Sequence, residues 1–223
     1  IKRSIEFYNH QVESFLDSKK SNPKLKALDC ITFDDESFSW DRQQKSDIEK
    51  GKKYKFGNES IYTSSYRPFR KEWCYFNRQL NNCVYQLPSI FPTPKHSNVL
   101  IYTVTANRDF SCLITNLIPA QQPDCTFQCF PLYYYEEKPT QHLTLFDLDN
   151  DQYTRRDGIT DFILEQCRSL YGPKVTKEDI FYYVYGLLHS PDYRSQFEPD
   201  LKKILPRLPL VEKPIDFWSF SKA

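Results

Sequence analysis

The pattern of apolar residues changes at Gly158 from strand-like to helical, and this change constrains the fold class more than any other feature. Before it, β-branched and aromatic runs separated by turn residues predict strands at 73–77, 83–87, 98–106, 110–115 and 126–135, and a mostly polar connection follows over 136–158. After it, Thr160 is the expected N-cap of a helix that ends at Gly172-Pro173, with one apolar face formed by Ile159, Phe162, Ile163, Cys167 and Leu170. The sequence therefore predicts an α+β protein, with a mainly β lobe followed by a helical lobe.

The segment TKEDIFYYVYGLLHSPDYR, residues 176–194, is dense in aromatic side chains. Thr176 and Asp179 fit a capping box, which predicts a helix over 177–189, and Ser190-Pro191 is expected to start the next one. Nearly the whole circumference of the first helix is apolar or aromatic, which is typical of a helix packed on several sides. We interpret the segment as a core that braces the fold rather than as an active site. His189 falls in the last turn, where an imidazolium would suit the helix dipole, and we interpret it as a cap.

Residues 1–20 have helical spacing, and a polar, basic tract follows them. Between Asp41 and Arg78 the chain has ten Lys or Arg residues and five acidic ones. The net charge of the whole chain is only +1, so any signal for a polyanionic partner is local. We divide the chain into a helical and basic connector, 1–60, a mainly β lobe, 61–150, and a helical bracing lobe, 151–223. The start at Ile1 and the absence of methionine favour a segment of a longer protein.

Cellular location and metal content are constrained by what the sequence lacks. No apolar run approaches the roughly 20 residues of a membrane span, and no signal-peptide core occurs near the start, so we expect a cytoplasmic protein without membrane contact. Seven cysteines without pairing rhythm are interpreted as reduced thiols. Cys125 and Cys129 could form half of a zinc site, but only His142 follows, so buried thiols are preferred and no metal is expected.

Catalytic motifs are not found either. The chain has no phosphate-binding glycine loop, no G-x-S-x-G and no N/D-P-P-Y tetrapeptide of the kind that adenine-N6 methyltransferases use to hold a flipped base. Asp192, Asp200 and Lys202 match the spacing of metal-dependent nucleases, but that motif needs its second half on a strand. Here apolar residues recur every four positions, which predicts a helix with Leu201 facing inward and a possible kink at Pro199. We therefore expect a binding module.

Several long motifs carry a resemblance to a known family. They are SYRPFRKEWCYFNR (65–78), YQLPSIFPTPKHSNVLI (85–101), FSCLITNLIP (110–119), QCFPLYYYE (128–136), DGITDFILEQCRSLYG (157–172) and, further on, LKKILPRLP and FWSFSKA. Together with residues 176–194 they resemble the C-terminal specificity region of Type ISP restriction-modification enzymes, over about 60–223, with a looser match before that. The family combines a nuclease, an ATP-driven translocase, an adenine-N6 methyltransferase and a target-recognition domain in one polypeptide.

The resemblance implies that this chain is the recognition domain and that 61–150 is its DNA-reading lobe. Its partners would be double-stranded DNA and, within the same polypeptide, an upstream methyltransferase. No cofactor is expected in the chain itself, since S-adenosylmethionine, ATP and Mg²⁺ would serve upstream domains. The missing catalytic motifs would then lie in those domains.

The residue types in the basic tract and in the predicted turns agree with such a role. Candidates for phosphate contacts are Lys52, Lys53, Lys55, Arg67, Arg70 and Lys71. Candidates for reading base edges, chosen for forked donors and amides, are Arg78, Gln79, Asn81, Asn82, Gln86, Lys95, His96, Asn107 and Arg108.

Three alternatives stay open. Any single lysine of the tract is as well explained by a solvated surface as by a phosphate contact, and Arg67 in YRPF fits a buried turn equally well. The triple tyrosine 133–135 could stack on an extruded base, but strand alternation separates Tyr134 from its neighbours and favours packing. The chain could also be a protein-interaction module whose aromatic helices dock a methyltransferase or a second subunit.

Overall fold

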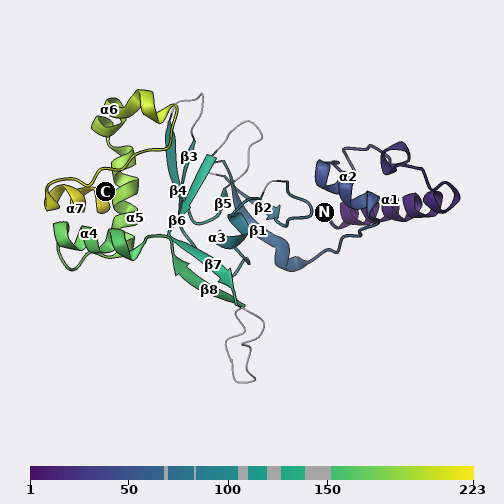
Figure 1. The fold of residues 1–223 in the computed structure, drawn as a ribbon, viewed down its shortest axis with the longest axis horizontal. Coiled ribbons are helices and arrows are strands. Elements are labelled where there is room, and N and C mark those ends of the chain that lie inside the picture. Colours follow the sequence, from purple (N-terminus) through teal and green to yellow (C-terminus); the bar gives the residue numbers. More distant parts are fainter. Residues whose placement is uncertain (68–69, 83, 105–109, 120–126, 139–151) are drawn as a thin grey trace, which may run out of the picture. The chain divides into compact units, whose positions relative to one another are not determined.

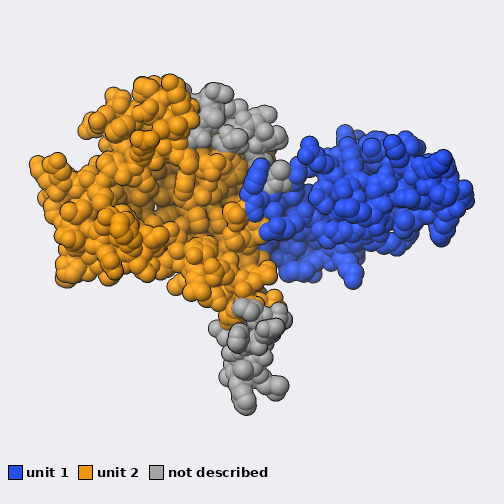
Figure 2. Space-filling view, viewed as in Figure 1, with its two compact units in different colours: residues 1–62, 73–85 blue, residues 63–72, 86–223 orange. Residues whose placement is uncertain are grey.

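The computed structural model describes residues 1–67, 70–82, 84–104, 110–119, 127–138 and 152–223 (Figure 1). The chain forms two compact units, which are coloured separately in Figure 2. Unit 1 contains residues 1–62 and 73–85, and unit 2 contains residues 63–72 and 86–223. The division into 1–60, 61–150 and 151–223 concerns the roles of the segments and stays a prediction.

Unit 1 is built on the N-terminal helix. Helix α1 (Lys2–Ser21) confirms the predicted helix, and η1 (Ala27–Asp29), α2 (Arg42–Glu49) and η2 (Asn58–Ser60) follow it. The buried face of α1 includes Tyr8, whose ring stacks on Tyr54 with centroids 4.2 Å apart. Helix α2 begins with a capping box, in which Asp41 caps the helix and Gln44 bonds back to the backbone of Asp41.

Unit 2 contains most of the strands, and its sheet of β3, β4 and β6 falls on the runs predicted at 98–106, 110–115 and 126–135. Strands β3 (Leu100–Val104), β4 (Ser111–Thr115) and β6 (Phe127–Pro131) form an antiparallel sheet in the order β4-β3-β6, in which Leu100 is opposite Thr115 and Pro131. Strand β7 (Tyr133–Glu137) pairs with β8 (Tyr153–Asp157). Strand β1 (Ile61–Arg67) lies between β2 (Arg70–Tyr75) and the short β5 (Ile118–Pro119), which runs parallel to it.

The helical part of unit 2 follows the sheets. It consists of α4 (Asp161–Tyr171), α5 (Lys177–His189), α6 (Pro191–Leu201) and α7 (Pro214–Ser221). Thr160 caps α4 through Ile163, Thr176 and Asp179 form the capping box of α5, and Ser190 caps α6, all as predicted. With strands mostly in the first part of the chain and these helices at the end, the fold class is α+β, which confirms the prediction.

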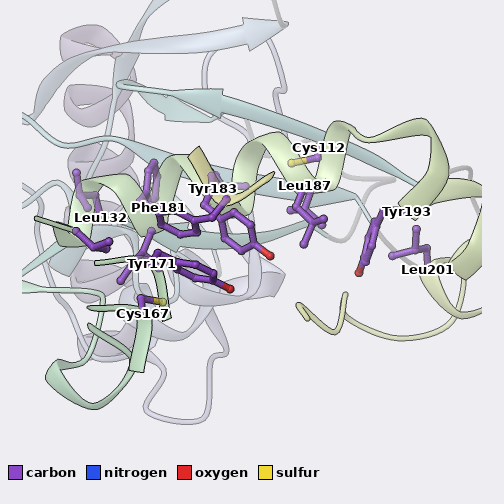
Figure 3. Packing of buried hydrophobic residues seen from close by; sticks show 14 residues of the cluster. Cys112, Leu132, Cys167, Tyr171, Phe181, Tyr183, Leu187, Tyr193 and Leu201 are labelled. Atoms are coloured by element: carbon purple, nitrogen blue, oxygen red, sulfur yellow. The ribbon is translucent and has the colours of Figure 1, made fainter. Parts of the chain in front are cut away.

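Helix α5 is the centre of the core in unit 2, and Figure 3 shows its side chains between the sheet and the other helices. Ile180, Phe181, Tyr183, Leu187 and Leu188 are all buried, so the aromatic segment is core, as expected. Three tyrosine hydroxyls at its margins donate to backbone carbonyls of the irregular segment 207–211: Tyr183 to Pro209 (2.6 Å), Tyr171 to Val211 (2.8 Å) and Tyr193 to Arg207 (2.7 Å). These bonds fasten the segment to the helices.

Two predictions about secondary structure were wrong. The strand predicted at 83–87 is not formed: Val84 to Gln86 lie outside any strand, and α3 (Leu87–Ile90) begins at Leu87. Pro88 at the second helical position is compatible with a helix start, whereas it could not donate to a strand ladder. The polar connection predicted over 136–158 contains strand β8. Arg155 and Arg156 are exposed and charged, so the sequence of this segment does not look like a strand, and only its pairing with β7 makes it one.

The remaining predictions about residue type have mixed outcomes. Tyr135 is buried and Tyr134 is exposed, so the predicted alternation of the tyrosines is confirmed. Cys30, Cys74, Cys112, Cys129 and Cys167 are free thiols, while Cys125 and His142 lie outside the described residues. No helix in the described part of the chain is both long and apolar enough to cross a membrane.

Candidate nucleic-acid interface

A groove of about 490 Å³ in unit 2 brings basic, amide and aromatic side chains together. It is lined by Ser65, Arg70, Lys71, Val99, Ile114, Thr115, Asn116, Leu117 and Tyr182. The groove forms because β5 pairs in parallel with β1, Ser65 opposite Pro119, which brings the end of β4 beside the strand that precedes Arg70. We call these residues the basic groove.

The two cations of the basic groove are held differently. The Nε of Arg70 is 2.8 Å from Oε1 of Glu72, and its guanidinium carbon is 5.9 Å from the centroid of the Tyr66 ring. This arrangement orients a side chain that remains 70% exposed. Lys71 is exposed on the same strand and is flexible enough to follow a phosphate. Arg70 and Lys71 were both predicted to contact phosphates.

The other wall of the basic groove contains two residues that the sequence analysis missed. Thr115 Oγ1 accepts the backbone N–H of Leu117 at 3.1 Å, which fixes a short turn and leaves Asn116 exposed at its tip. Tyr182, on the exposed side of α5, is 40% accessible. The Asn in LITNLIP was a detectable turn signal between two strands, but nothing in the sequence placed Tyr182 opposite it.

The lysines predicted in unit 1 are partly used in ion pairs. Lys52 is 3.2 Å from the buried carboxylate of Asp47, and Lys53 is 2.5 Å from Glu13. Burial opposes ionisation of Asp47, but hydrogen bonds from Gln43, Tyr54 and Lys52 together hold its pKa below the usual value. The side chains of Lys52 and Lys53 are about half exposed, and Lys55 is exposed.

A rigid turn in unit 1 contains four predicted base-reading residues. Asn77 Oδ1 accepts the backbone N–H groups of Gln79 and Leu80, and Asn81 Oδ1 accepts that of Asn77 at 2.9 Å. The carbonyl of Gln79 accepts a hydrogen bond from Gln44 at 2.7 Å. Asn81 therefore holds the turn together, while Arg78 and Asn82 are exposed on it.

Comparisons with known proteins decide the family. The Type ISP C-terminal specificity domain family matches residues 1–223, the whole chain. The chain belongs to this family. No curated protein matches it.

Three solved structures resemble the specificity domain over nearly its full length. "ATP-dependent Type ISP restriction-modification enzyme LlaBIII bound to DNA" matches with 27% identity and a TM-score of 0.74, covering 99% of this chain and 13% of that one. A nuclease-deletion mutant of the Type ISP enzyme LlaGI, in complex with a DNA substrate mimic, matches with 28% identity and a TM-score of 0.75, covering 99% and 18%. The DrdV-DNA complex matches with 28% identity and a TM-score of 0.73, covering 98% and 19%. The specificity domain thus spans less than a fifth of the length of these relatives.

Of the remaining predicted site residues, the described Gln86, Lys95 and His96 do not line the basic groove. Gln86 is the exposed N-cap of α3, and Lys95 is exposed on a turn. The ring of His96 packs 4.7 Å from that of Tyr135, and its Nδ1 is 2.7 Å from Thr93 Oγ1. The side chain of Arg67, and all of Asn107 and Arg108, lie outside the described residues.

His189 of the specificity domain is not the charged cap that the sequence predicted. Burial and the nearby Arg194 lower the pKa of His189. Arg194 Nη2 lies 3.2 Å from His189 Nδ1, and because a guanidinium can only donate, the imidazole accepts and is neutral in this arrangement. Arg194 Nε also donates to the carbonyl of Leu188 at 2.6 Å. The arginine therefore caps a terminal carbonyl of α5, the role that the sequence predicted for His189.

The nuclease-like spacing in the specificity domain falls on a helix. Asp192 and Asp200 both belong to α6, which includes Pro199, and Leu201 is buried as predicted. Lys202 Nζ is 2.8 Å from Glu198. Among the described residues no three His, Cys, Asp or Glu side chains are grouped to hold a metal ion. Nothing in the part of the specificity domain that the structure describes points to a catalytic site.

Proposed function

We propose that this specificity domain recognises a sequence in double-stranded DNA on behalf of a Type ISP restriction-modification enzyme. The observation that carries the proposal is the basic groove, because it combines two exposed cations with a turn-mounted amide and an exposed aromatic ring. Relatives of the domain support it, since LlaBIII, LlaGI and DrdV are described in complexes with DNA or a DNA mimic.

The chemistry of the basic groove suits the two tasks of a DNA reader. Arg70 and Lys71 would neutralise phosphates and fix the register of the protein on the duplex. Asn116 is an amide on a short turn stabilised by Thr115, and an amide can bond adenine N6 and N7 in the major groove. The predicted contacts in unit 1, from Lys52, Lys53, Lys55, Arg78 and Asn82, would be further contacts of the domain with DNA.

The catalytic steps belong to other parts of such an enzyme in this proposal. An adenine-N6 methyltransferase using S-adenosylmethionine, and an ATP- and Mg²⁺-dependent motor and nuclease, would act on DNA that the domain holds. The domain would contact the methyltransferase within one cytoplasmic polypeptide. Its own contribution is the choice of site.

A docking role has one specific observation in its favour. Phe162 and Leu170 on α4 and Ile215 on α7 are 71%, 52% and 74% exposed, an unusual number of large apolar side chains on two helices. A methyltransferase covering these side chains would bind through apolar surface, and its affinity would depend little on salt. DNA binding, in contrast, weakens steeply as salt rises.

The decisive experiment selects binding sites for the 223-residue chain from a pool of random-sequence duplexes at several salt concentrations. We expect one enriched asymmetric sequence and an affinity that falls as salt increases. Arg70→Ala with Lys71→Ala should weaken binding to all sequences and reduce the slope of log affinity against log salt by about two, at ~0.9 per phosphate contact.

Lys174→Ala with Lys203→Ala is the matched control, because it removes the same charge from exposed positions outside the basic groove. This control should keep both the selected sequence and the slope. Enrichment of no sequence, with a salt-independent background, would refute the proposal for this chain and favour the docking role.

A further inference from the structure

A second, larger cavity in unit 2 lies away from the basic groove. Its volume is about 600 Å³, and it lies among the β4-β3-β6 sheet, α5, α3 and residues 205–208. The walls are formed by side chains such as Ile101, Phe181 and Leu188, which are buried, and Val184, which is partly buried. Leu205, Leu208, Phe130 and Tyr134 are each about 40% exposed, so they form a rim open to solvent.

The inner wall of this cavity includes an unpartnered hydroxyl. Thr103 is 0% exposed. Among the described residues, Thr103 Oγ1 is the one buried polar side-chain atom that has no hydrogen-bond partner. Thr103 and Ile101 are two positions apart on β3, so both side chains point to the face of the sheet that packs on α5. An unpaired hydroxyl in such a place costs free energy, and buried polar groups are ordinarily paired.

The other polar groups of the cavity restrict its ligand further. None of the described residues that line it carries a formal charge, and the polar side chains besides Thr103 are Gln86 and Ser89 from the region of α3 and Tyr134. A charged ligand would therefore enter without a counter-charge, which is unfavourable.

We propose that this cavity binds an uncharged, largely apolar small molecule that has one group able to hydrogen-bond to Thr103 Oγ1. The volume lies within the roughly 300–1,000 Å³ of ligand pockets, which are mostly apolar with a few placed polar groups. A small molecule fits better than a protein surface, because the polar anchor is on the buried strand β3 rather than at the rim. The site is separate from the basic groove and would bind its ligand without DNA.

The test compares 1-naphthol with naphthalene, two probes of nearly equal shape of which only the first carries a hydroxyl. Binding to the 223-residue chain is measured by ligand-observed NMR and confirmed by calorimetry. We expect saturable binding of both, with 1-naphthol about fivefold tighter, the effect of one neutral hydrogen bond. Thr103→Val, which keeps the shape of the side chain, should make the two affinities equal, while Thr154→Val on β8 should leave the preference intact.

Two further variants separate the cavity from other sites and from misfolding. Val184→Phe, which fills the cavity from α5, should abolish binding of both probes while circular dichroism shows the fold retained. Without any ligand, Thr103→Val should raise the melting temperature, because it removes the unpaired hydroxyl. A gain of a factor of five to six in the folding equilibrium would correspond to a rise of about 2–4 °C. Thr115→Val should lower it, because that hydroxyl accepts a hydrogen bond from Leu117.

Three results with the probes and with Thr103→Val would overturn the proposal, and a fourth comes from Val184→Phe. The first three are no saturable binding of either probe, a preference for 1-naphthol that survives in Thr103→Val, and a lower melting temperature in Thr103→Val. Binding that persists in a folded Val184→Phe variant would place the probes elsewhere and would overturn it as well.

Discussion

The hydroxyl of Tyr54 donates a hydrogen bond of 2.8 Å to the carboxylate of Asp47, which is 2% exposed in unit 1. Gln43 and Lys52 donate to the same carboxylate at 3.0 and 3.2 Å. A buried charge is tolerated only when it is surrounded by donors in this way. The carboxylate of Asp47 and its donors therefore join α2 to the segment that carries Lys52, Lys53 and Lys55.

Tyr54→Phe should lower the free energy of unfolding by ~1.5–3 kcal/mol at pH 7, the usual range for a hydrogen bond to a charged group. The pKa of Asp47 is held below 3.8, so its contribution to stability is present above that value and is lost as the pH falls through the folded pKa. Urea unfolding at pH 7 and at pH 3 should show a smaller loss in acid. Tyr182→Phe is the control, and an equal loss at both pH values would contradict the assignment.

Gly186 is required because α5 and α7 approach closely at this point. A Cβ added there would collide with the backbone carbonyl oxygen of Phe220, which cannot move without shifting α7. Gly186→Ala should therefore destabilise unit 2, although alanine is favoured over glycine in helices by about 1 kcal/mol. Thermal unfolding checks this sign, with Ser169→Ala on the exposed side of α4 as a control expected to be neutral or slightly stabilising. A stabilised Gly186→Ala variant would mean that the helices are not in contact there.

Asn98 connects three segments through one buried amide. Its Nδ2 donates to the carbonyls of Ile90 (3.0 Å) and Tyr133 (2.6 Å), and its Oδ1 accepts the N–H groups of Val99 (2.8 Å) and Tyr133 (3.2 Å). Asn98→Ala leaves these backbone groups unpaired, so we expect a loss of roughly 3 kcal/mol or more in the free energy of unfolding. Urea unfolding of this variant beside Asn82→Ala, an exposed asparagine, gives the comparison. A loss similar to that of the control would show that water replaces the amide.

The elements that the sequence predicted are those whose signals are local. The caps Thr160 and Thr176, the helical spacing of α1 and α5, and the β-branched runs of β3 and β4 each depend on neighbouring residues alone. Strand β8 was missed because its charged residues become a strand only through pairing with β7. His189 was misjudged because Arg194 reaches it from the next helix.

The candidate site was predicted in part for the same reason. Arg70 and Lys71 belong to a basic tract that composition reveals. Asn116 and Tyr182 join them through the parallel pairing of β5 with β1 and through the packing of α5, which are long-range relationships. The sequence indicates which residue types such a groove contains, whereas the topology of the sheet and the helix packing determine which residues come together in it.

His189 gives a second, separate pH dependence. Because its pKa is lowered from 6.5 in the folded state, the unfolded chain binds more protons near pH 6, and stability is lost as the pH falls from 6.5 through the folded pKa. Arg194→Gln removes the charge beside the imidazole, so the pKa of His189 should rise toward 6.5 without reaching it, since burial remains. NMR titration of His189 measures this directly, with Arg207→Gln as the control. An unchanged pKa would leave burial as the whole cause.

Asn116 and Tyr182 should affect the choice of DNA sequence rather than the electrostatic part of binding. Asn116→Ala removes an amide from the tip of the turn that Thr115 holds, and a lost bidentate contact to a base costs ~1–3 kcal/mol of discrimination at one position. We therefore expect relaxed preference at one base pair of the selected site, with the salt dependence of binding unchanged, because no phosphate contact is lost.

Tyr182→Ala should lower affinity for every sequence if the ring stacks or packs on DNA, whereas Tyr182→Phe should preserve it. Selection from random duplexes with each variant measures both effects, and Asn82→Ala in unit 1 tests whether the exposed amides are equivalent. If Asn116→Ala leaves every position of the selected site unchanged, the reading residues lie outside the basic groove, and the turn that carries Arg78 becomes the next surface to test.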